Sequence, residues 1–151
     1  MLFRSGYDGT PILLMRPTDL ASIAKLLLVA KQQLEAAGFK VDFQQMDWAS
    51  LLARRAKKDA PAQGGWHLFL TAWTAGDISN PLAMAMFNAK GQNGWFGWQD
   101  EPRIEDLKSK FARAGSAAEK RKIASDIQTI AFETATHAPL GQYRKIGRAH
   151  V

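Results

Sequence analysis

Residues 66–81 decide the fold expected for this chain, and they read Trp-His-Leu-Phe-Leu-Thr-Ala-Trp-Thr-Ala-Gly-Asp-Ile-Ser-Asn-Pro. A short apolar run from His67 to Trp73 follows two glycines, as is typical of a largely buried strand. The residues after the run are mostly small or polar, and Asp77 supplies a single carboxylate. Because open α/β sheets bind ligands where a strand ends in a loop, this stretch predicts a sheet with a ligand-contacting edge.

Two further strands are predicted upstream, at residues 12–15 and 39–46. Between them, apolar residues recur at helical spacing over 20–34, and a second helix is expected over 48–58 with Asp47 as its N-cap. Three strands that alternate with two helices favour parallel pairing through right-handed crossovers. The predicted fold class is therefore α/β, a mainly parallel sheet flanked by helices.

The first of these helices carries clear signals at both ends. Thr18 or Asp19 is expected to cap its N-terminus, and Gly38 to end it. The apolar run 26–29 widens its apolar face, as expected for a helix that packs on a sheet.

The second half of the chain predicts a loop and two helices. Residues 88–99 are rich in glycine and carry Trp95, Phe96 and Trp98, which either plug the loop onto the domain or stack on a ligand or partner. A helix is expected to begin at the acids before Pro102 and to break at Gly115. Ser116-Ala117-Ala118-Glu119 predicts a capping box for a last helix that runs to about Thr136.

Composition is that of a globular protein of one domain, since 46% of its 151 residues are hydrophobic. The chain has no cysteine, which excludes disulfides and thiolate metal sites. No apolar run approaches the roughly 20 residues that span a bilayer.

Both ends of the chain look foreign. Residues 146–151 match the translation of a common sequencing-library adapter, and residues 1–5 match that of its reverse complement. We expect 6–145 to be the natural segment and both ends to be adapter-derived artefacts. Without Arg4 and Arg148 the formal charge of +6 falls to +4, which says little about nucleic acid.

The sequence contains no recognisable catalytic or metal-binding set. His67 is expected to be a hydrogen-bonded strand histidine, and the chain is predicted to be a non-enzyme without a cofactor or metal. The basic residues 54–58 are interpreted as a solvated helix end, with phosphate binding as the alternative. A binding edge remains, in which Trp73 offers a wall and Asp77 a carboxylate for a ligand ammonium. Alternatively, Trp73 belongs to the core and Asp77 caps a turn.

Several sequence blocks carry a resemblance in their order and spacing: Gly6-Tyr7-Asp8-Gly9, Pro11-Ile12-Leu13-Leu14, Leu34 to Val41 before Asp47-Trp48, Ala72-Trp73-Thr74-Ala75-Gly76-Asp77 with Asn80-Pro81, Trp95-Phe96-Gly97-Trp98, and Ala138-Pro139-Leu140-Gly141-Gln142-Tyr143. Together they resemble the C-terminal lobe of extracellular solute-binding protein family 5, the dipeptide/oligopeptide-binding components of ABC importers. The resemblance covers nearly all of residues 6–145.

The resemblance implies a fragment of one lobe of a type II-like periplasmic binding protein. Such a protein closes two lobes on a peptide or similar small solute and delivers it to ABC permease subunits. The implied partners are that solute, the N-terminal lobe and the permease, with no nucleic acid, and the implied location is periplasmic or at the cell surface. The implied ligand-binding residues are Trp73, Thr74 and Asp77.

The spacing around the acid departs from the pattern of peptide-binding members. There an aspartate three residues after the tryptophan pairs with the peptide's amino terminus, whereas here Gly76 intervenes and Asp77 is fourth. Peptides, amino-acid derivatives, small glycans and metal chelates therefore all stay open as ligands. The alternative function is a stand-alone basic module that binds nucleic acid through residues 54–58 and the tryptophan-rich loop.

Overall fold

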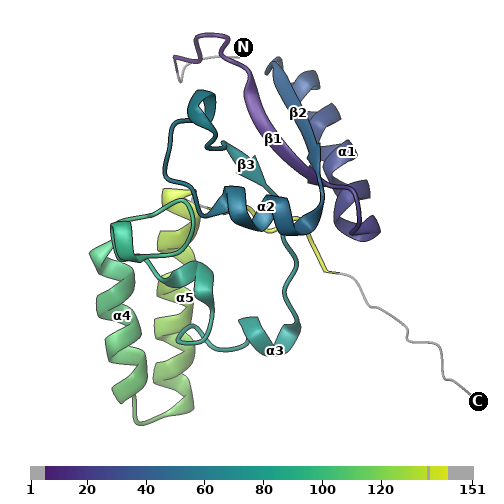
Figure 1. Ribbon diagram of the computed structural model, residues 1–151. Helices are drawn as coiled ribbons and strands as arrows, with labels where there is room; N and C mark the ends of the chain where they lie inside the picture. Colours follow the sequence, from purple (N-terminus) through teal and green to yellow (C-terminus); the bar gives the residue numbers. More distant parts are fainter. Residues whose placement is uncertain (1–5, 136, 143–151) are drawn as a thin grey trace, which may run out of the picture. The chain divides into compact units, whose positions relative to one another are not determined.

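The computed structural model describes residues 6–135 and 137–142, which form two compact units (Figure 1). The first unit ends at Trp73 and is called the sheet unit, and the second begins at Thr74 and is called the helical unit. The predicted adapter-derived ends, 1–5 and 146–151, lie outside the described residues. None of the helices in the described part of the chain is long and apolar enough to cross a membrane.

The sheet unit is an α/β fold built on three parallel strands, as predicted. Strands β1 (Ile12–Pro17), β2 (Val41–Met46) and β3 (Leu68–Phe69) lie in the order β2-β1-β3. The central strand β1 pairs in parallel with both neighbours. Helix α1 (Ala21–Ala36) connects β1 to β2, and helix α2 (Trp48–Arg55) with a 3₁₀ turn (Pro61–Gln63) connects β2 to β3.

The core of the sheet unit lies on both faces of β1, because successive strand residues point to opposite faces. On one face, Leu14 clusters with Ile23 and Leu27 of α1. On the other face, Leu13 and Met15 cluster with Leu51 of α2. Each helix therefore covers its own face of the sheet.

Helix α1 ends as predicted but begins differently. Gly38 has φ of 90°, and the amides of Gly38 and Phe39 donate to the carbonyls of Glu35 (2.8 Å) and Leu34 (3.0 Å), which is a Schellman motif. At the other end Leu20 is the N-cap, and no side chain caps the helix. The prediction that Thr18 or Asp19 caps α1 is wrong.

The expectation that the run 26–29 widens the buried face of α1 is also wrong. Only Leu27 of this run is buried, while Leu26, Leu28 and Val29 are 44%, 43% and 49% exposed. One helix packed on one sheet face can bury a single stripe, and the three exposed side chains project from outside that stripe.

The chain segments that directly follow β1 and β2 are hydrogen-bonded to each other. The amide of Thr18 donates to the carbonyl of Met46 (2.9 Å), and the amide of Trp48 donates to Oδ1 of Asp19 (2.9 Å). Asp47 caps α2 as predicted, since its Oδ1 accepts from the amide of Ser50 (2.9 Å). The Asp19 carboxylate therefore accepts a hydrogen bond at the start of α2 and does not cap α1. Helix α2 ends at Arg55, three residues earlier than expected.

The third strand is much shorter than the apolar run that predicts it. Only Leu68 and Phe69 are paired as a strand, although the run extends from His67 to Trp73. Leu68 is 40% exposed, so the expectation of a largely buried strand fails at this position. Among the described residues, β3 has a paired strand on one side only.

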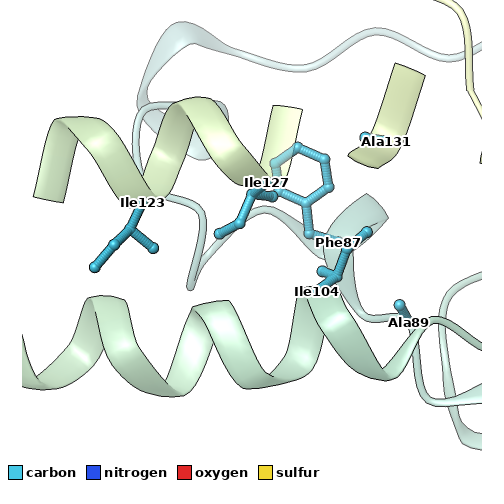
Figure 2. Packing of buried hydrophobic residues seen from close by; sticks show 6 residues of the cluster. All are labelled: Phe87, Ala89, Ile104, Ile123, Ile127 and Ala131. Carbon is cyan, nitrogen blue, oxygen red and sulfur yellow. The ribbon is translucent and has the colours of Figure 1, made fainter. Parts of the chain in front are cut away.

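The helical unit consists of short turns followed by two long helices. The turns are helix α3 (Ala75–Ile78) and two 3₁₀ turns (Ala85–Phe87 and Gly91–Asn93). Helices α4 (Pro102–Arg113) and α5 (Ala117–Thr134) pack against each other. The buried side chains of these two helices form one cluster with two residues that precede α4 (Figure 2). The cluster contains Phe87 and Ala89 from before α4, Ile104 from α4, and Ile123, Ile127 and Ala131 from α5.

The predicted signals at the ends of α4 and α5 are present with small differences. Helix α4 has Pro102 at its first position, as expected. Ser116 caps α5 by accepting the amide of Glu119 (3.1 Å), but the carboxylate of Glu119 accepts from the amide of Gly115 (3.1 Å) instead of that of Ser116. The predicted capping box is thus only half formed. Helix α5 ends at Thr134, close to the expected position.

Candidate functional site

The three predicted ligand-binding residues lie on either side of the boundary between the units. Trp73 is the last residue of the sheet unit, four residues beyond β3, and is half-buried. Thr74 and Asp77 are exposed and belong to the helical unit.

Thr74 and Asp77 are brought together by a capping box at the start of α3. The Thr74 hydroxyl donates to Oδ2 of Asp77 (2.7 Å), and the Thr74 amide donates to the same oxygen (3.1 Å). In return the amide of Asp77 donates to the Thr74 hydroxyl oxygen (3.3 Å). Helix α3 was not expected, although Thr74-x-x-Asp77 is the [Ser/Thr]-x-x-[Asp/Glu] pattern that predicts such a box.

The capping box determines which part of the Asp77 carboxylate is free for a ligand. Both bonds from Thr74 go to Oδ2, and no donor among the described residues reaches Oδ1. Asp77 thus fills the turn-capping role of the alternative interpretation, and it keeps one exposed oxygen that can accept a further hydrogen bond. Its role toward a ligand stays a prediction.

The tryptophan loop (residues 88–100) is folded on itself in the helical unit. The amide of Gly91 donates to the carbonyl of Gln99 (2.9 Å), and the amide of Trp95 donates to the carbonyl of Asn88 (2.8 Å). A Cβ on Gly94 would lie 2.5 Å from that same carbonyl oxygen, so only glycine allows this closure.

The three aromatic side chains of this loop are half-buried. The rings of Trp95 and Phe96 pack edge to face, with centroids 4.7 Å apart. Trp98 has a positive φ of 51°, which is unusual for a bulky side chain. Partial burial fits both predicted roles, packing of the loop onto the domain and stacking on a ligand or partner.

The basic cluster 54–58 makes internal contacts at the end of α2. Arg54 donates through Nε to the carbonyl of Gly65 (2.9 Å) and through Nη1 to the side chain of Gln44. The guanidinium of Arg55 lies 5.4 Å from the ring centroid of Phe69, and burial lowers the pKa of Arg55. These two arginines hold α2 to the strands and loop beside it, which gives them a structural role within the sheet unit.

His67 is hydrogen-bonded as predicted, but it lies directly before β3 instead of within it and is exposed. Its Nδ1 accepts the amide of Leu13 (2.9 Å), and its own amide donates to the carbonyl of Leu13 (3.3 Å). Because Nδ1 is an acceptor, the neutral ring carries its proton on Nε2. Within residues 6–135 and 137–142, no group of three metal-ligating side chains comes together.

Comparison with known proteins gives one informative relative. No family model matches the sequence. The chain is 27% identical over 138 residues to a probable peptide ABC transporter periplasmic-binding protein of Sinorhizobium fredii (strain NBRC 101917 / NGR234). The match covers 91% of this chain and 26% of that protein, so the chain spans about a quarter of the relative's length. This chain is therefore similar, over most of its length, to one part of a periplasmic-binding protein of an ABC transporter.

Proposed function

We propose that this chain is a fragment of the substrate-binding protein of an ABC importer. In this proposal the whole protein binds a peptide or similar small solute between two lobes and delivers it to the membrane permease. The observation that carries the proposal is the similarity over 91% of the chain to a periplasmic-binding protein of a peptide ABC transporter. The parallel α/β sheet and the order of the sequence blocks support an assignment to solute-binding protein family 5.

Trp73, Thr74 and Asp77 are the proposed ligand-binding residues. The half-buried Trp73 would form an apolar wall, and Oδ1 of Asp77 would accept a hydrogen bond from a ligand ammonium. Thr74 would act through Asp77, because its two hydrogen bonds fix the orientation of that carboxylate. A carboxylate held in this way loses little conformational entropy when it binds a cation.

The remaining partners follow from the same proposal. The facing lobe and the permease contacts would come from the rest of the parent protein, in the periplasm or at the cell surface. Residues 6–145 would be the natural segment, and a parent gene that codes for Met-Leu-Phe-Arg-Ser directly before Gly6 would contradict that boundary.

The test is a thermal-shift screen of the longer parent protein, recovered with its flanking sequence, against dipeptides and other small solutes. A ligand that binds the folded state raises the melting temperature. Asp77→Asn keeps a side chain that can accept from Thr74 but removes the charge, so we expect it to abolish the shift given by a dipeptide. Asp106→Asn, which changes an exposed acid on α4, is the matched control and should leave the shift unchanged.

Two results would count against the proposal. If no small solute shifts the melting temperature of the parent, a solute-binding function is wrong. If Asp77→Asn responds to the dipeptide as the unchanged parent does, Asp77 acts only as a cap. The 151-residue chain by itself should bind weakly or not at all, because a clamp needs both of its lobes.

A further inference from the structure

A hollow that is open to solvent lies beside helix α2 in the sheet unit. It has a volume of about 370 Å³ and is called the α2 hollow. It is lined by Ser50, Ala53, Arg54 and Lys57, which come from α2 and the residues after it, and by Gly64 of the loop before β3. None of the three predicted ligand-binding residues lines it, so the α2 hollow is a different feature from the candidate ligand site.

The charged side chains that line the α2 hollow are both basic. Arg54 and Lys57 line it, and no carboxylate among the described residues does. Neither cation forms an ion pair within residues 6–135 and 137–142. By contrast, Lys31 of α1 and Lys110 of α4 each pair with an acid four residues away. A basic surface without a neutralising acid attracts anions.

Hydrogen bonds within the sheet unit fix the guanidinium of Arg54. Its Nε donates to the carbonyl of Gly65 (2.9 Å), and its Nη1 donates to the side chain of Gln44, which in turn donates to Asp42 (2.7 Å). The position of Gly65 is itself fixed, because a Cβ there would lie 1.8 Å from the carbonyl oxygen of Asp59 and only glycine fits. Nη2 of Arg54 has no acceptor among the described residues and is available to a ligand. A side chain held in this way loses little conformational entropy on binding.

The ammonium of Lys57 is the second donor at the α2 hollow. Lys57 is exposed, and its Nζ has no hydrogen-bond acceptor among the described residues. Its side chain lies beside Gly64, since a Cβ on that glycine would be 3.5 Å from Nζ. Gly64 has φ of 97°, a conformation that favours glycine, so no side chain at this position covers the ammonium.

A carboxylate near one end of the α2 hollow determines where an anion can bind. The Ser50 hydroxyl donates to Oδ2 of Asp47 (2.6 Å), which places a negative charge beside the Ser50 end. The hydroxyl proton of Ser50 is also occupied by this bond. An anion is therefore disfavoured at the Ser50 end and attracted to the end formed by Arg54 and Lys57.

We propose that the α2 hollow binds a phosphate group through Nη2 of Arg54 and Nζ of Lys57. Guanidinium and ammonium groups both bind phosphate oxygens through charge-assisted hydrogen bonds. The phosphate can be the free ion or the headgroup of an anionic phospholipid, since both present the same oxygens. The inference goes beyond the proposed function and does not depend on it. It assigns phosphate binding to two residues of the basic cluster 54–58.

Titration of the 151-residue chain with sodium phosphate, followed by the NMR shifts of its backbone amides, tests the site. The ionic strength is held constant with sodium chloride, because added salt screens every charge on the surface. The amides of Lys57, Gly64 and Gly65 should shift along a saturable curve. The amides of α4 and α5 should not shift, since neither helix lines the α2 hollow.

Charge substitutions separate this site from the net charge of the protein. Lys57→Glu should weaken phosphate binding about tenfold or more, through the loss of a charge-assisted hydrogen bond. Lys25→Glu makes the same change at an exposed lysine of α1 and should leave the affinity unchanged. Lys57→Arg keeps the positive charge and should keep the binding. The amide spectrum of each variant shows whether it is folded.

Sedimentation with lipid vesicles distinguishes the two sources of the phosphate group. If the source is a lipid headgroup, the chain should sediment with phosphatidylglycerol vesicles and not with phosphatidylcholine vesicles. Lys57→Glu should then abolish the sedimentation, and Lys25→Glu should preserve it. If the source is the free ion, only the titration with sodium phosphate should respond to Lys57→Glu.

Two outcomes would overturn the inference. The first is a titration in which sodium phosphate causes no saturable shift around the α2 hollow. The second is an equal loss of phosphate binding in Lys57→Glu and Lys25→Glu, which would assign the binding to the net charge. The proposed function is tested separately, by small solutes and Asp77→Asn in the parent protein. Failure of either proposal therefore leaves the other standing.

Discussion

The sheet unit and the helical unit bury their apolar side chains in different ways. In the sheet unit, two small clusters lie on opposite faces of β1, and each depends on a helix from a different connection. In the helical unit, one cluster fills the space between α4 and α5, which are neighbours in sequence. A hairpin of helices closes its own core through local contacts, whereas a parallel sheet joins distant segments and keeps open edges. The sheet unit thus depends on contacts between segments distant in the sequence, whereas the helical unit depends mainly on neighbouring ones. Both units leave large apolar side chains exposed, such as Leu68 (40%) in the first and Phe132 (64%) in the second.

The largest expected loss of stability comes from substitutions that disrupt the core of one unit at a time. Leu14→Ala and Ile127→Ala each remove a fully buried side chain, and each should lower the free energy of unfolding by about 2–5 kcal/mol. Because the two residues belong to different clusters, Leu14→Ala should raise hydrogen exchange in β1 and α1 and spare α4 and α5. Urea denaturation with residue-resolved exchange measures both. Equal loss of protection in both units would show that they unfold together.

The next effect concerns Glu105, which fastens the tryptophan loop to α4. Its Oε1 accepts from the amide of Ala89 (2.9 Å) and from Nζ of Lys108 (3.0 Å). Glu105→Gln should cost about 1.5 kcal/mol, since hydrogen bonds to charged groups are stronger than neutral ones. Asp106→Asn, at an exposed neighbour, is the control.

The effect of Glu105 should also depend on pH. Burial alone would raise the pKa of Glu105, but the hydrogen bonds from Ala89 and Lys108 outweigh it, so the pKa of the folded state is lowered. The stabilisation is therefore complete above the ordinary pKa of a glutamate and is lost as the pH falls through the lowered value. Urea midpoints of the protein and of Glu105→Gln should converge in acid. A difference that persists unchanged to the lowest pH would contradict the role of the charge.

A smaller effect is expected at the cap of α5, which is local to the helical unit. Ser116→Ala removes the acceptor of the Glu119 amide and should cost about 1 kcal/mol. Ser109→Ala, at an exposed position inside α4, should be neutral or slightly stabilising because alanine is the better helix former. Thermal denaturation of the two variants checks the difference. A loss at Ser109 as large as that at Ser116 would remove the capping explanation.

The smallest expected change in unfolding free energy comes from surface ion pairs, one in each unit. Lys31 and Glu35 pair on α1 at 2.7 Å, and Asp106 and Lys110 pair on α4 at 2.7 Å. Both pairs are solvent-exposed, so neutralising Glu35 or Asp106 should cost less than about 0.5 kcal/mol. The acid-first order on α4 should be slightly the stronger. A cost above 1 kcal/mol for Glu35→Gln, measured by urea denaturation, would be inconsistent with a screened surface pair.

The parts of the fold that depend on local patterns could be predicted from the sequence. The Gly38 end of α1 and the Asp47 cap of α2 follow from signals within a few residues of each element. The parallel pairing of the strands follows from their alternation with helices along the chain. The predictions that failed concern side chains whose partners are set by tertiary packing. Asp19 is equally able to cap the helix beside it or to bond a distant amide, and the exposure of Val29 depends on what lies over α1.

The candidate site could be predicted as a position but not as an arrangement. The Trp73–Asp77 stretch was recognisable, and Thr74-x-x-Asp77 contained the capping pattern. Which carboxylate oxygen of Asp77 faces Thr74 is a matter of side-chain geometry that a sequence does not encode. The length of β3 was overestimated because an apolar run does not show how many of its residues pair with a neighbouring strand, and only Leu68 and Phe69 do so.

The hydrogen bond between Asp19 and the amide of Trp48 has a consequence for the accuracy of folding. The two residues are 29 positions apart and meet only when β1 and β2 pair with Pro17 opposite Met46. A slip of β2 by one residue would move Trp48 about 3.3 Å along the sheet and break this bond. This hydrogen bond therefore favours the correct register of β1 and β2. In a misaligned pair, the amide of Trp48 at the start of α2 would lose its acceptor.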